Sequence, residues 1–172
     1  MKTHTQLVKR FIATLLFSTL VLGCPNSPTT GSFEDGRQAY KDGDYQRAFE
    51  IIQPFAEQGD PKAQIYIGTM YDLGIGVPQD YSEAAKWYRK AAEQGNAIAQ
   101  INLGIMYRLG QGVPQNYIEA HKWYNLAASR FPPGEYQETA LKNQNILEKK
   151  MTPAQVAEAQ KLAREWKPKP AQ

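Results

Sequence analysis

Few side chains of this chain could support covalent, acid–base or metal chemistry. It has one cysteine, Cys24, and two histidines, His4 and His121. A single cysteine excludes a disulfide or a thiolate metal cluster within the chain. A lone histidine in a helical pattern, as at His121, is more often a packed or surface residue than a ligand. We therefore expect no metal ion and no small-molecule cofactor.

Pairs of opposite charges recur at one spacing, Glu83 with Lys86 and Glu119 with Lys122. Such a set could exchange protons in a reaction. Three residues apart on a helix, however, the simpler interpretation is a solvated ion pair worth a few tenths of a kcal/mol. No Ser/His/Asp set and no paired-carboxylate motif stands out, although a site assembled in space from distant residues stays open. The sequence therefore predicts a protein that is not an enzyme.

Two further motifs could contact phosphates or bases. Gly-x-Gly occurs at 74–76 and 110–112, and Trp-Tyr occurs at 87–88 and 123–124. A dinucleotide-binding loop needs a preceding strand and a third glycine, and the sequence predicts neither, so we interpret both glycine motifs as turns. Trp-Tyr could stack on bases. Because both pairs recur beside alanines, packing between helices is the favoured interpretation.

The amino-terminal residues have the order of an export signal. Residues 2–10 are basic, and residues 11–22 read FIATLLFSTLVL, an apolar run too short to span ~30 Å of hydrocarbon. Residues 21–24, VLGC, resemble the lipobox of bacterial lipoproteins, with Val21 in place of the usual leucine. The resemblance implies cleavage after residue 23, acylation of Cys24 and membrane anchoring on the periplasmic side. An ordinary signal peptide with an incidental cysteine is the alternative.

The net charge of +3 comes from this leader. Residues 1–23 hold three basic and no acidic side chains, so their removal leaves 17 of each sign. A neutral chain has no global attraction for nucleic acid or anionic lipid, and we predict neither as a partner. Residues 24–32 are rich in Pro, Ser and Thr and read as a flexible tether. By resemblance to enterobacterial lipoproteins, Pro25 in place of aspartate favours the outer membrane over the inner.

The chain is organised around one segment that occurs twice. Residues 61–94 and 97–130 align at a shift of 36 positions, with 20 of the 34 pairs identical. A fixed period in this range predicts a solenoid of stacked helical units. In each copy the run Leu-Gly-x-Gly-Val-Pro-Gln separates two helices. We expect Gly74 and Gly110 to end the first helix, and Asp80 and Asn116 to cap the second.

Glycine also interrupts the first helix of each copy, at Gly68 and Gly104. A mid-helix glycine costs ~1 kcal/mol relative to alanine. Its use at the same place in both copies indicates that a neighbouring helix approaches closely there.

The flanking residues predict further helix pairs. Thr152-Pro153-Ala154-Gln155 is a helix start, with a threonine cap and a glutamine at the capping-box position. The predicted units are a degenerate N-terminal repeat at 33–60, two full repeats at 61–96 and 97–130, a C-terminal capping pair at 131–166, and a frayed tail at 167–172.

The repeated pattern A-x-x-x-x-G-x-x-Y-x-x-G-x-G-V-x-x-D/N-Y-x-x-A-x-x-W-Y-x-x-A-A resembles the Sel-one-like repeat family, a branch of the tetratricopeptide-like repeats. Residues 61–130 carry two strong copies and 33–60 a weak one. The resemblance implies an all-α, right-handed α/α solenoid of helix pairs with capping helices, and adaptor roles. Many members staple each repeat with a cysteine pair. This chain has none, so its stability must come from packing.

A candidate binding face is marked by positions at which the two copies differ. On the first helices, differing pairs fall at offsets of 0, 4, 7 and 10 residues, which is one helical face away from the packed side. In tetratricopeptide-like solenoids this face lines the concave groove. We predict that a protein or peptide partner contacts Lys62, Tyr66, Thr69, Asp72, Ile98, Asn102, Ile105 and Arg108. Unconstrained surface is the alternative.

These observations predict a non-enzymatic, lipid-anchored interaction module in the periplasm. Resemblance to Sel-one-like lipoproteins leaves two roles open, an adaptor or an immunity protein against a secreted phospholipase effector. The competing class is a cell-envelope enzyme that binds or hydrolyses β-lactams, as credited to some cysteine-rich relatives. The lack of a nucleophile–base pair argues against that class.

Overall fold

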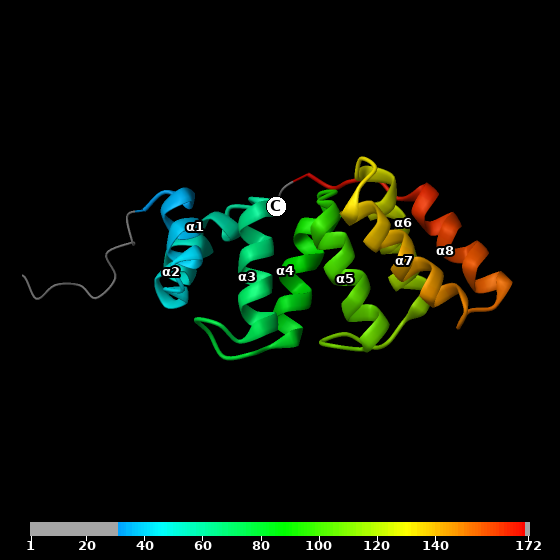
Figure 1. Cartoon of the computed structure of the whole chain (residues 1–172), viewed down its shortest axis with the longest axis horizontal. Helices are drawn as coiled ribbons and strands as arrows, with labels where there is room; N and C mark the ends of the chain where they lie inside the picture. Colours follow the sequence, from blue (N-terminus) through cyan, green and yellow to red (C-terminus); the bar gives the residue numbers. More distant parts are fainter. Residues whose placement is uncertain (1–30, 171–172) are drawn as a thin grey trace, which may run out of the picture. The chain divides into compact units, whose positions relative to one another are not determined.

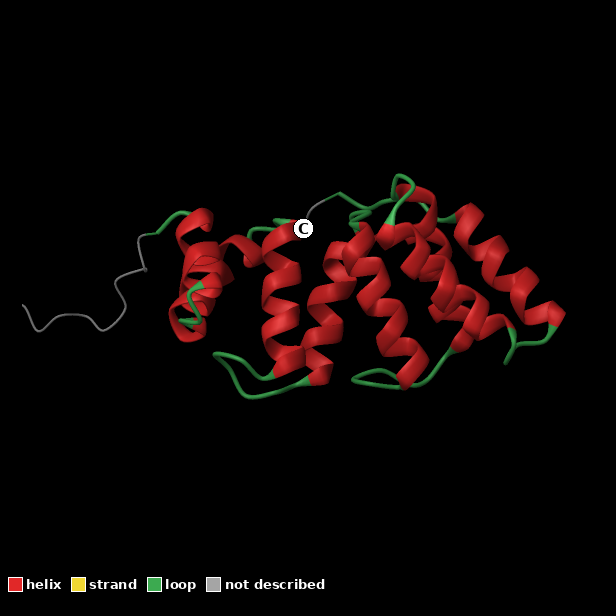
Figure 2. Ribbon diagram, viewed as in Figure 1, coloured by secondary structure: helices red, strands yellow, loops and turns green. Residues whose placement is uncertain are grey.

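The computed structural model describes residues 31–170, and these are helical apart from turns and short extended segments (Figures 1 and 2). The prediction for Cys24 and its leader falls outside the described residues. Within residues 31–170 there is no strand, and none of the helices is long and apolar enough to cross a membrane. The helices in this range are α1 Phe33–Lys41, α2 Tyr45–Glu57, α3 Pro61–Leu73, α4 Tyr81–Glu93, α5 Ala97–Leu109, α6 Tyr117–Arg130, α7 Glu135–Glu148 and α8 Pro153–Glu165.

Local side-chain signals set most of the helix ends. Asp80 accepts hydrogen bonds from two amides of the first turn of α4, and Asn116 accepts one from α6, which confirms both predicted caps. Gly74 and Gly110 end α3 and α5 in the left-handed conformation, as predicted. Thr152 forms the predicted capping box at the start of α8. Caps of this kind each contribute about 1 kcal/mol, so they fix the borders of the repeats.

The helices pack on their neighbours in chain order, from α1 on α2 through to α5 on α6. The predicted apolar face of α3 is buried, with Ala63, Ile67 and Met70 inaccessible to solvent against α2. Tyr88 on α4 and Tyr124 on α6 are buried in the same way, in two adjoining cores. The predicted all-α helical-repeat solenoid is therefore confirmed.

The mid-helix glycines do mark close approaches. A Cβ on Gly68 would lie 2.8 Å from Cδ1 of Tyr88, and one on Gly104 would lie 2.7 Å from Cε1 of Tyr124. The tyrosine ring of the second helix thus lies directly on the glycine of the first helix. This stacking lets each tyrosine hydroxyl reach the far side of α3 or α5, where the predicted binding residues lie.

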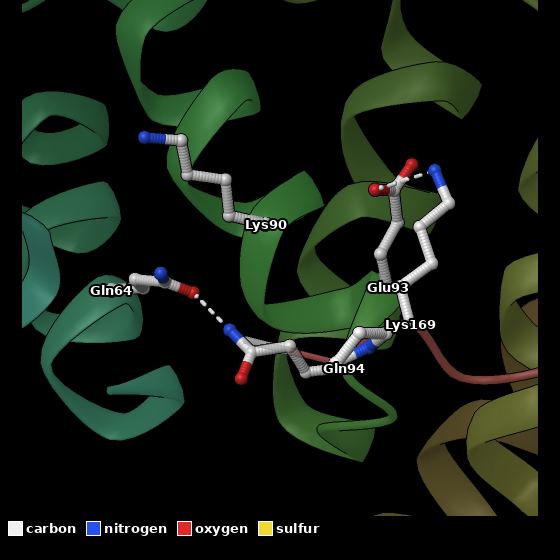
Figure 3. Close-up of a pocket in the computed structure, with 6 residues that line it drawn as sticks. Gln64, Lys90, Glu93, Gln94 and Lys169 are labelled. Atoms are coloured by element: carbon white, nitrogen blue, oxygen red, sulfur yellow. Dashed lines mark hydrogen bonds and ion pairs between the residues drawn. The ribbon is translucent and has the colours of Figure 1, made fainter. Parts of the chain in front are cut away.

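The C-terminal residues depart from the prediction. Helices α7 and α8 both pack on α6. After α8 the chain returns toward α4, where the Lys169 amide donates to the Glu93 carbonyl at 2.8 Å and the Lys169 ammonium lies 3.0 Å from the Glu93 carboxylate (Figure 3). The prediction of a frayed tail is therefore wrong at Lys169. The anchor is Trp166, whose ring packs on Trp123.

Candidate protein-binding face

The eight predicted binding residues lie on the accessible side of α3 and α5, and we call this surface the first-helix face. Ile98 is 40% exposed and Lys62 is also exposed, whereas the other six are partly buried. The helical offsets therefore separate the packed side from the accessible side correctly. Whether a partner binds there stays a prediction. The members of the face are Lys62, Tyr66, Thr69, Asp72, Ile98, Asn102, Ile105 and Arg108.

Part of this face lines a groove. Lys62, Tyr66 and Ile98 border an open groove with a volume of about 630 Å³. Its remaining wall comes from α1 and from the first turns of α3 and α5, through Phe33, Glu34, Arg37, Asp60, Ile65 and Asn96. We call it the N-terminal groove. The sequence missed the contribution of α1 because the degenerate first repeat has no close copy with which to compare it.

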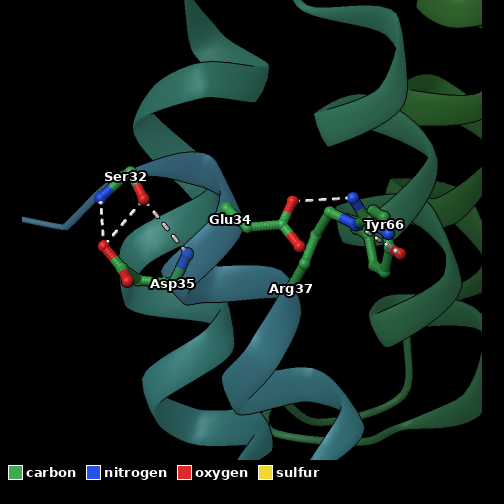
Figure 4. Close-up of polar contacts among 5 residues, drawn as sticks. All are labelled: Ser32, Glu34, Asp35, Arg37 and Tyr66. Atoms are coloured by element: carbon green, nitrogen blue, oxygen red, sulfur yellow. Dashed lines mark hydrogen bonds and ion pairs between the residues drawn. The ribbon is translucent and has the colours of Figure 1, made fainter.

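The α1 wall of the N-terminal groove is held in place by polar contacts (Figure 4) and by contacts between aromatic rings. Arg37 forms an ion pair with Glu34 at 2.7 Å, and its Nε donates to the Tyr66 hydroxyl at 3.4 Å. The Tyr66 ring also makes edge-to-face contacts with Phe33 and Tyr40, at centroid distances of 5.9 and 5.1 Å. The groove therefore presents a fixed aromatic surface with mixed charges at its border, which suits a protein or peptide ligand.

In the first full repeat, the middle of the first-helix face is occupied by an internal contact. The Tyr88 hydroxyl passes over Gly68 and lies 3.0 Å from the Thr69 hydroxyl and 3.5 Å from an Asp72 carboxylate oxygen. Burial raises the pKa of the Asp72 carboxyl, and the hydrogen bond from Tyr88 opposes that shift. Thr69 and Asp72 thus have structural partners, which weakens the prediction that they are free to contact a ligand.

In the second full repeat, the equivalent hydroxyl has no such partner. Ile105 stands in the place of Thr69, and Arg108 stands in the place of Asp72. The Tyr124 hydroxyl and the Nε of Arg108 are both buried, and neither makes a well-aligned hydrogen bond among the described residues. Burial raises the pKa of Tyr124, and the hydrogen-bonding contact with Arg108 and its positive charge oppose that shift. Identical tyrosines therefore have different surroundings in the two copies.

This difference predicts unequal losses of stability for the same substitution in the two repeats. Tyr88→Phe removes a hydroxyl that satisfies buried polar neighbours, so we expect a loss of about 1 kcal/mol in the free energy of unfolding. Tyr124→Phe removes a buried hydroxyl whose contact with Arg108 is poorly aligned, so we expect a smaller loss, near zero. Urea denaturation of both variants measures the two values. Equal losses would show that both hydroxyls are satisfied in solution.

The other chemistry-bearing residues are used within the fold. His121 is fully buried on α6, with its Nε2 2.9 Å from a Glu148 oxygen on α7. The predicted ion pairs are present, Lys86 with Glu83 and Lys122 with Glu119. In the part of the chain that the structure describes, no cluster of three or more His, Cys, Asp or Glu side chains could hold a metal ion.

The pocket beside the C-terminal segment is small (Figure 3). It encloses about 40 Å³ and is bordered by Gln64, Lys90, Glu93, Gln94 and Lys169. Gln94 donates to Gln64 at 2.9 Å across it. A space of this size holds one or two water molecules at most, so it does not compete with the first-helix face as a site for a partner.

The helix pairs stack in chain order, and the first helix of each pair has one side accessible to solvent. This arrangement defines a helical-repeat solenoid. Residues 32–60, 61–96 and 97–130 each match the model of the Sel1 repeat. Together these three matches cover more than half of the sequence, and the chain belongs to the Sel1 repeat family. Repeats of this kind generally mediate protein–protein interaction.

Two solved structures are similar to this chain. One is c5321, a protective antigen present in uropathogenic Escherichia coli strains that displays the same repeat fold. It shares 32% identity over 78% of this chain, with a TM-score of 0.72. The other is a Sel1 repeat protein from Oxalobacter formigenes, with 38% identity over 67% of this chain and a TM-score of 0.61. The chain spans 28% and 46% of their lengths. No curated protein matches it.

Proposed function

We propose that this chain is a non-enzymatic, lipid-anchored module that binds a protein or peptide on its first-helix face, on the periplasmic side of the bacterial envelope. The observation that carries the binding part is the N-terminal groove. There a fixed aromatic side chain, Tyr66, lies beside the exposed Ile98 and the charges of Arg37 and Lys62. Accessible aromatic and apolar groups with a polar border are the usual composition of a protein interface.

Arg108 and Asn102 extend this surface beyond the groove, along α5. Both are partly exposed, and the Arg108 side chain contacts the Tyr124 hydroxyl on its buried side. The Asn102 amide is therefore available to a ligand, and Arg108 adds a positive charge to the same surface.

We expect the double variant Asn102→Ala, Arg108→Ala to weaken partner capture at least tenfold while leaving the fold intact. Because both side chains are partly exposed and only Arg108 has an internal polar contact, with Tyr124, the midpoint of urea unfolding should fall only slightly. The measurement is affinity capture from envelope extract, with the captured proteins identified by mass spectrometry. Ser82→Ala, Lys86→Ala on the exposed side of α4 is the matched control. A partner captured equally by both variants would place the binding surface elsewhere.

The anchoring part of the proposal rests on the sequence of the leader. A thiol is the nucleophile that thioether formation to a lipid requires, and a single acyl chain holds a protein only weakly, so several chains are needed. We propose that acylated Cys24 holds the chain on the outer membrane. The helical repeats, with the N-terminal groove, would then lie in the periplasm, joined to the anchor by the predicted tether at 24–32.

Cys24→Ser should release the protein from the membrane fraction, because serine cannot accept the lipid and none of the described helices is a membrane span. Salt-washed membranes are compared with the soluble fraction by immunoblot, with Ser27→Ala as the control in the same segment. A Cys24→Ser variant that stays with the washed membranes would exclude lipidation at this position.

Two narrower roles fit a groove that holds a protein, an adaptor and an immunity protein that neutralises a secreted phospholipase effector. Protection of cells that express the chain against such an effector would support the second role. A covalent adduct in a penicillin acylation assay would overturn the non-enzymatic part of the proposal.

A further inference from the structure

The C-terminal segment, residues 166–170, lies on the second helices of the two full repeats in an extended form. It has no helix or turn, and its last four residues are exposed. The prolines at 168 and 170 have fixed φ angles, and each restricts the residue before it to an extended conformation. Because proline has no backbone N–H, only Lys169 has one to donate among residues 168–170. The sequence therefore favours the extended shape of the segment and leaves it one backbone donor.

The segment contacts the repeats at two points that are three residues apart. The Trp166 ring lies edge-on to Trp123 with 6.3 Å between centroids, and the Arg130 guanidinium is 4.6 Å from the Trp166 centroid. The Lys169 amide donates to the Glu93 carbonyl at 2.8 Å, and its ammonium lies 3.0 Å from the Glu93 carboxylate (Figure 3). Helix α6 thus receives an aromatic ring, and the end of α4 receives both the backbone and the side chain of a lysine.

The lysine contact is weak. The Lys169 side chain is 58% exposed, and an exposed ion pair contributes little because water screens both charges. The Trp166 ring is also partly exposed. The segment is therefore attached loosely enough for another extended chain to replace it.

The tryptophan contact carries a cost of its own inside the second repeat. In the first copy, Gln94 donates to the buried Gln64 at 2.9 Å. Arg130 stands in the place of Gln94 in the second copy, and its guanidinium lies over Trp166. Oε1 of the buried Gln100, the counterpart of Gln64, is left without a donor among the described residues. Release of the tryptophan frees the guanidinium to donate to that oxygen, which offsets part of the cost of release.

We propose that the C-terminal segment occupies a binding site for an extended segment of a protein partner, one with an aromatic residue three positions before a lysine flanked by prolines. The ring binds against Trp123 and Arg130, and the lysine binds at Glu93. A permanent brace gains nothing from an exposed lysine contact and an unpaired buried acceptor, whereas an occupant that a partner replaces needs a loose attachment. Prolines also lower the ordering cost of binding an extended chain.

This site is separate from the first-helix face, because α4 and α6 are the second helices of their repeats. The inference therefore does not depend on the proposed function. With the C-terminal segment in place, the remaining space beside Glu93 is only about 40 Å³. A partner thus binds at this site only after the segment has left it.

The test measures binding of a synthetic peptide to the full chain by fluorescence anisotropy. The peptide is REWKPKP, the sequence of residues 164–170, labelled with fluorescein at its amino end and amidated at its carboxyl end. The Trp166→Ala chain, in which the segment is released, should bind it saturably. The unchanged chain should bind it at least about tenfold more weakly, because its own segment competes at a high effective concentration.

Matched changes in the peptide and the chain test the lysine contact. A Lys169→Gln peptide should bind the Trp166→Ala chain roughly threefold more weakly, the scale of an exposed ion pair. Adding Glu93→Gln to that chain should weaken the lysine peptide by the same factor and leave the glutamine peptide unchanged. A Trp166→Ala peptide should lose its binding.

A second variant keeps the test valid if Trp166→Ala does not fold. Lys169→Gln in the full chain changes only an exposed side chain and loosens the segment, so the lysine peptide should bind it roughly threefold more tightly than it binds the unchanged chain. A peptide GGFGPKP, which keeps only the aromatic residue, the lysine and both prolines at their spacing, should also bind saturably.

No saturable binding to either variant, or equal binding of the lysine and glutamine peptides, would overturn the inference. Failure of GGFGPKP alone would show that the site accepts only the chain's own sequence and not a partner of this chemistry. If the unchanged chain dimerised with rising concentration in size-exclusion chromatography, and Glu93→Gln abolished the dimer, the occupant would be the C-terminal segment of a second copy.

Discussion

Gly112→Ala is expected to lower the free energy of unfolding by about 3 to 5 kcal/mol, whereas Gly110→Ala should cost only about 1 kcal/mol. Both glycines adopt positive φ angles, +66° and +72°, and an L residue with a side chain pays roughly 1–2 kcal/mol for such a conformation. The difference lies in what the new methyl group would meet.

At Gly112 the obstacle is backbone. A Cβ there would lie 2.0 Å from the carbonyl oxygen of Tyr81, at the start of α4 in the preceding repeat. That oxygen cannot move without moving the helix, so the loop must separate from α4 and the overpacking adds to the conformational cost. At Gly110 the nearest atom is Cβ of Gln115, at 3.3 Å, so the loop need shift by only a few tenths of an ångström.

Urea unfolding of the two variants measures both values under one condition. The first copy supports the same interpretation, because a Cβ on Gly76 would lie 2.6 Å from the Tyr45 carbonyl oxygen at the start of α2. Equal costs at Gly110 and Gly112 would show that the second glycine of the motif is needed only for its turn, and not for the contact between successive repeats.

The sequence predicted the features that arise from local interactions. A cap such as Asp80 contacts amides two and three residues away, and a left-handed glycine such as Gly110 ends its own helix, so both are readable from short patterns. The close approach at Gly68 and Gly104 was also predictable, because a costly residue used twice needs a reason. Its partner, a tyrosine ring of the next helix, was not identifiable from spacing alone.

Contacts between residues of different repeats could not be predicted from the sequence. The role of Gly112 depends on the Tyr81 carbonyl some thirty residues earlier, and the wall formed by Arg37 depends on its contact with Tyr66 on another repeat. Comparison of the two copies located the first-helix face through the residues that differ. That comparison could not show which of the differing residues contact the tyrosine common to both copies. Tyr88 and Tyr124 therefore have different surroundings that the sequence alone did not reveal.

The C-terminal segment shows the same limit. The sequence suggested Trp166 as the last apolar residue of a capping helix. In the structure it follows α8 and lies beside the preceding repeat, with its ring edge-on to Trp123 at 6.3 Å and the Arg130 guanidinium 4.6 Å above its centroid. Arg130 stands where the first copy has Gln94, which bonds to the buried Gln64. Because Arg130 is turned to Trp166, Oε1 of the equivalent Gln100 has no partner among the described residues.

Trp166→Ala is therefore expected to lower the free energy of unfolding by about 2 to 3 kcal/mol, below the cost of a fully buried tryptophan because the ring is partly exposed. The variant should also free the segment that follows. Hydrogen exchange at the Lys169 amide, which is bonded to Glu93, should rise toward the rate of an unstructured chain. Lys169→Ala is the control, since its exposed ion pair should contribute less than about 1 kcal/mol. If Lys169→Ala were as costly as Trp166→Ala, the salt bridge and not the indole would hold the C-terminal segment against α4.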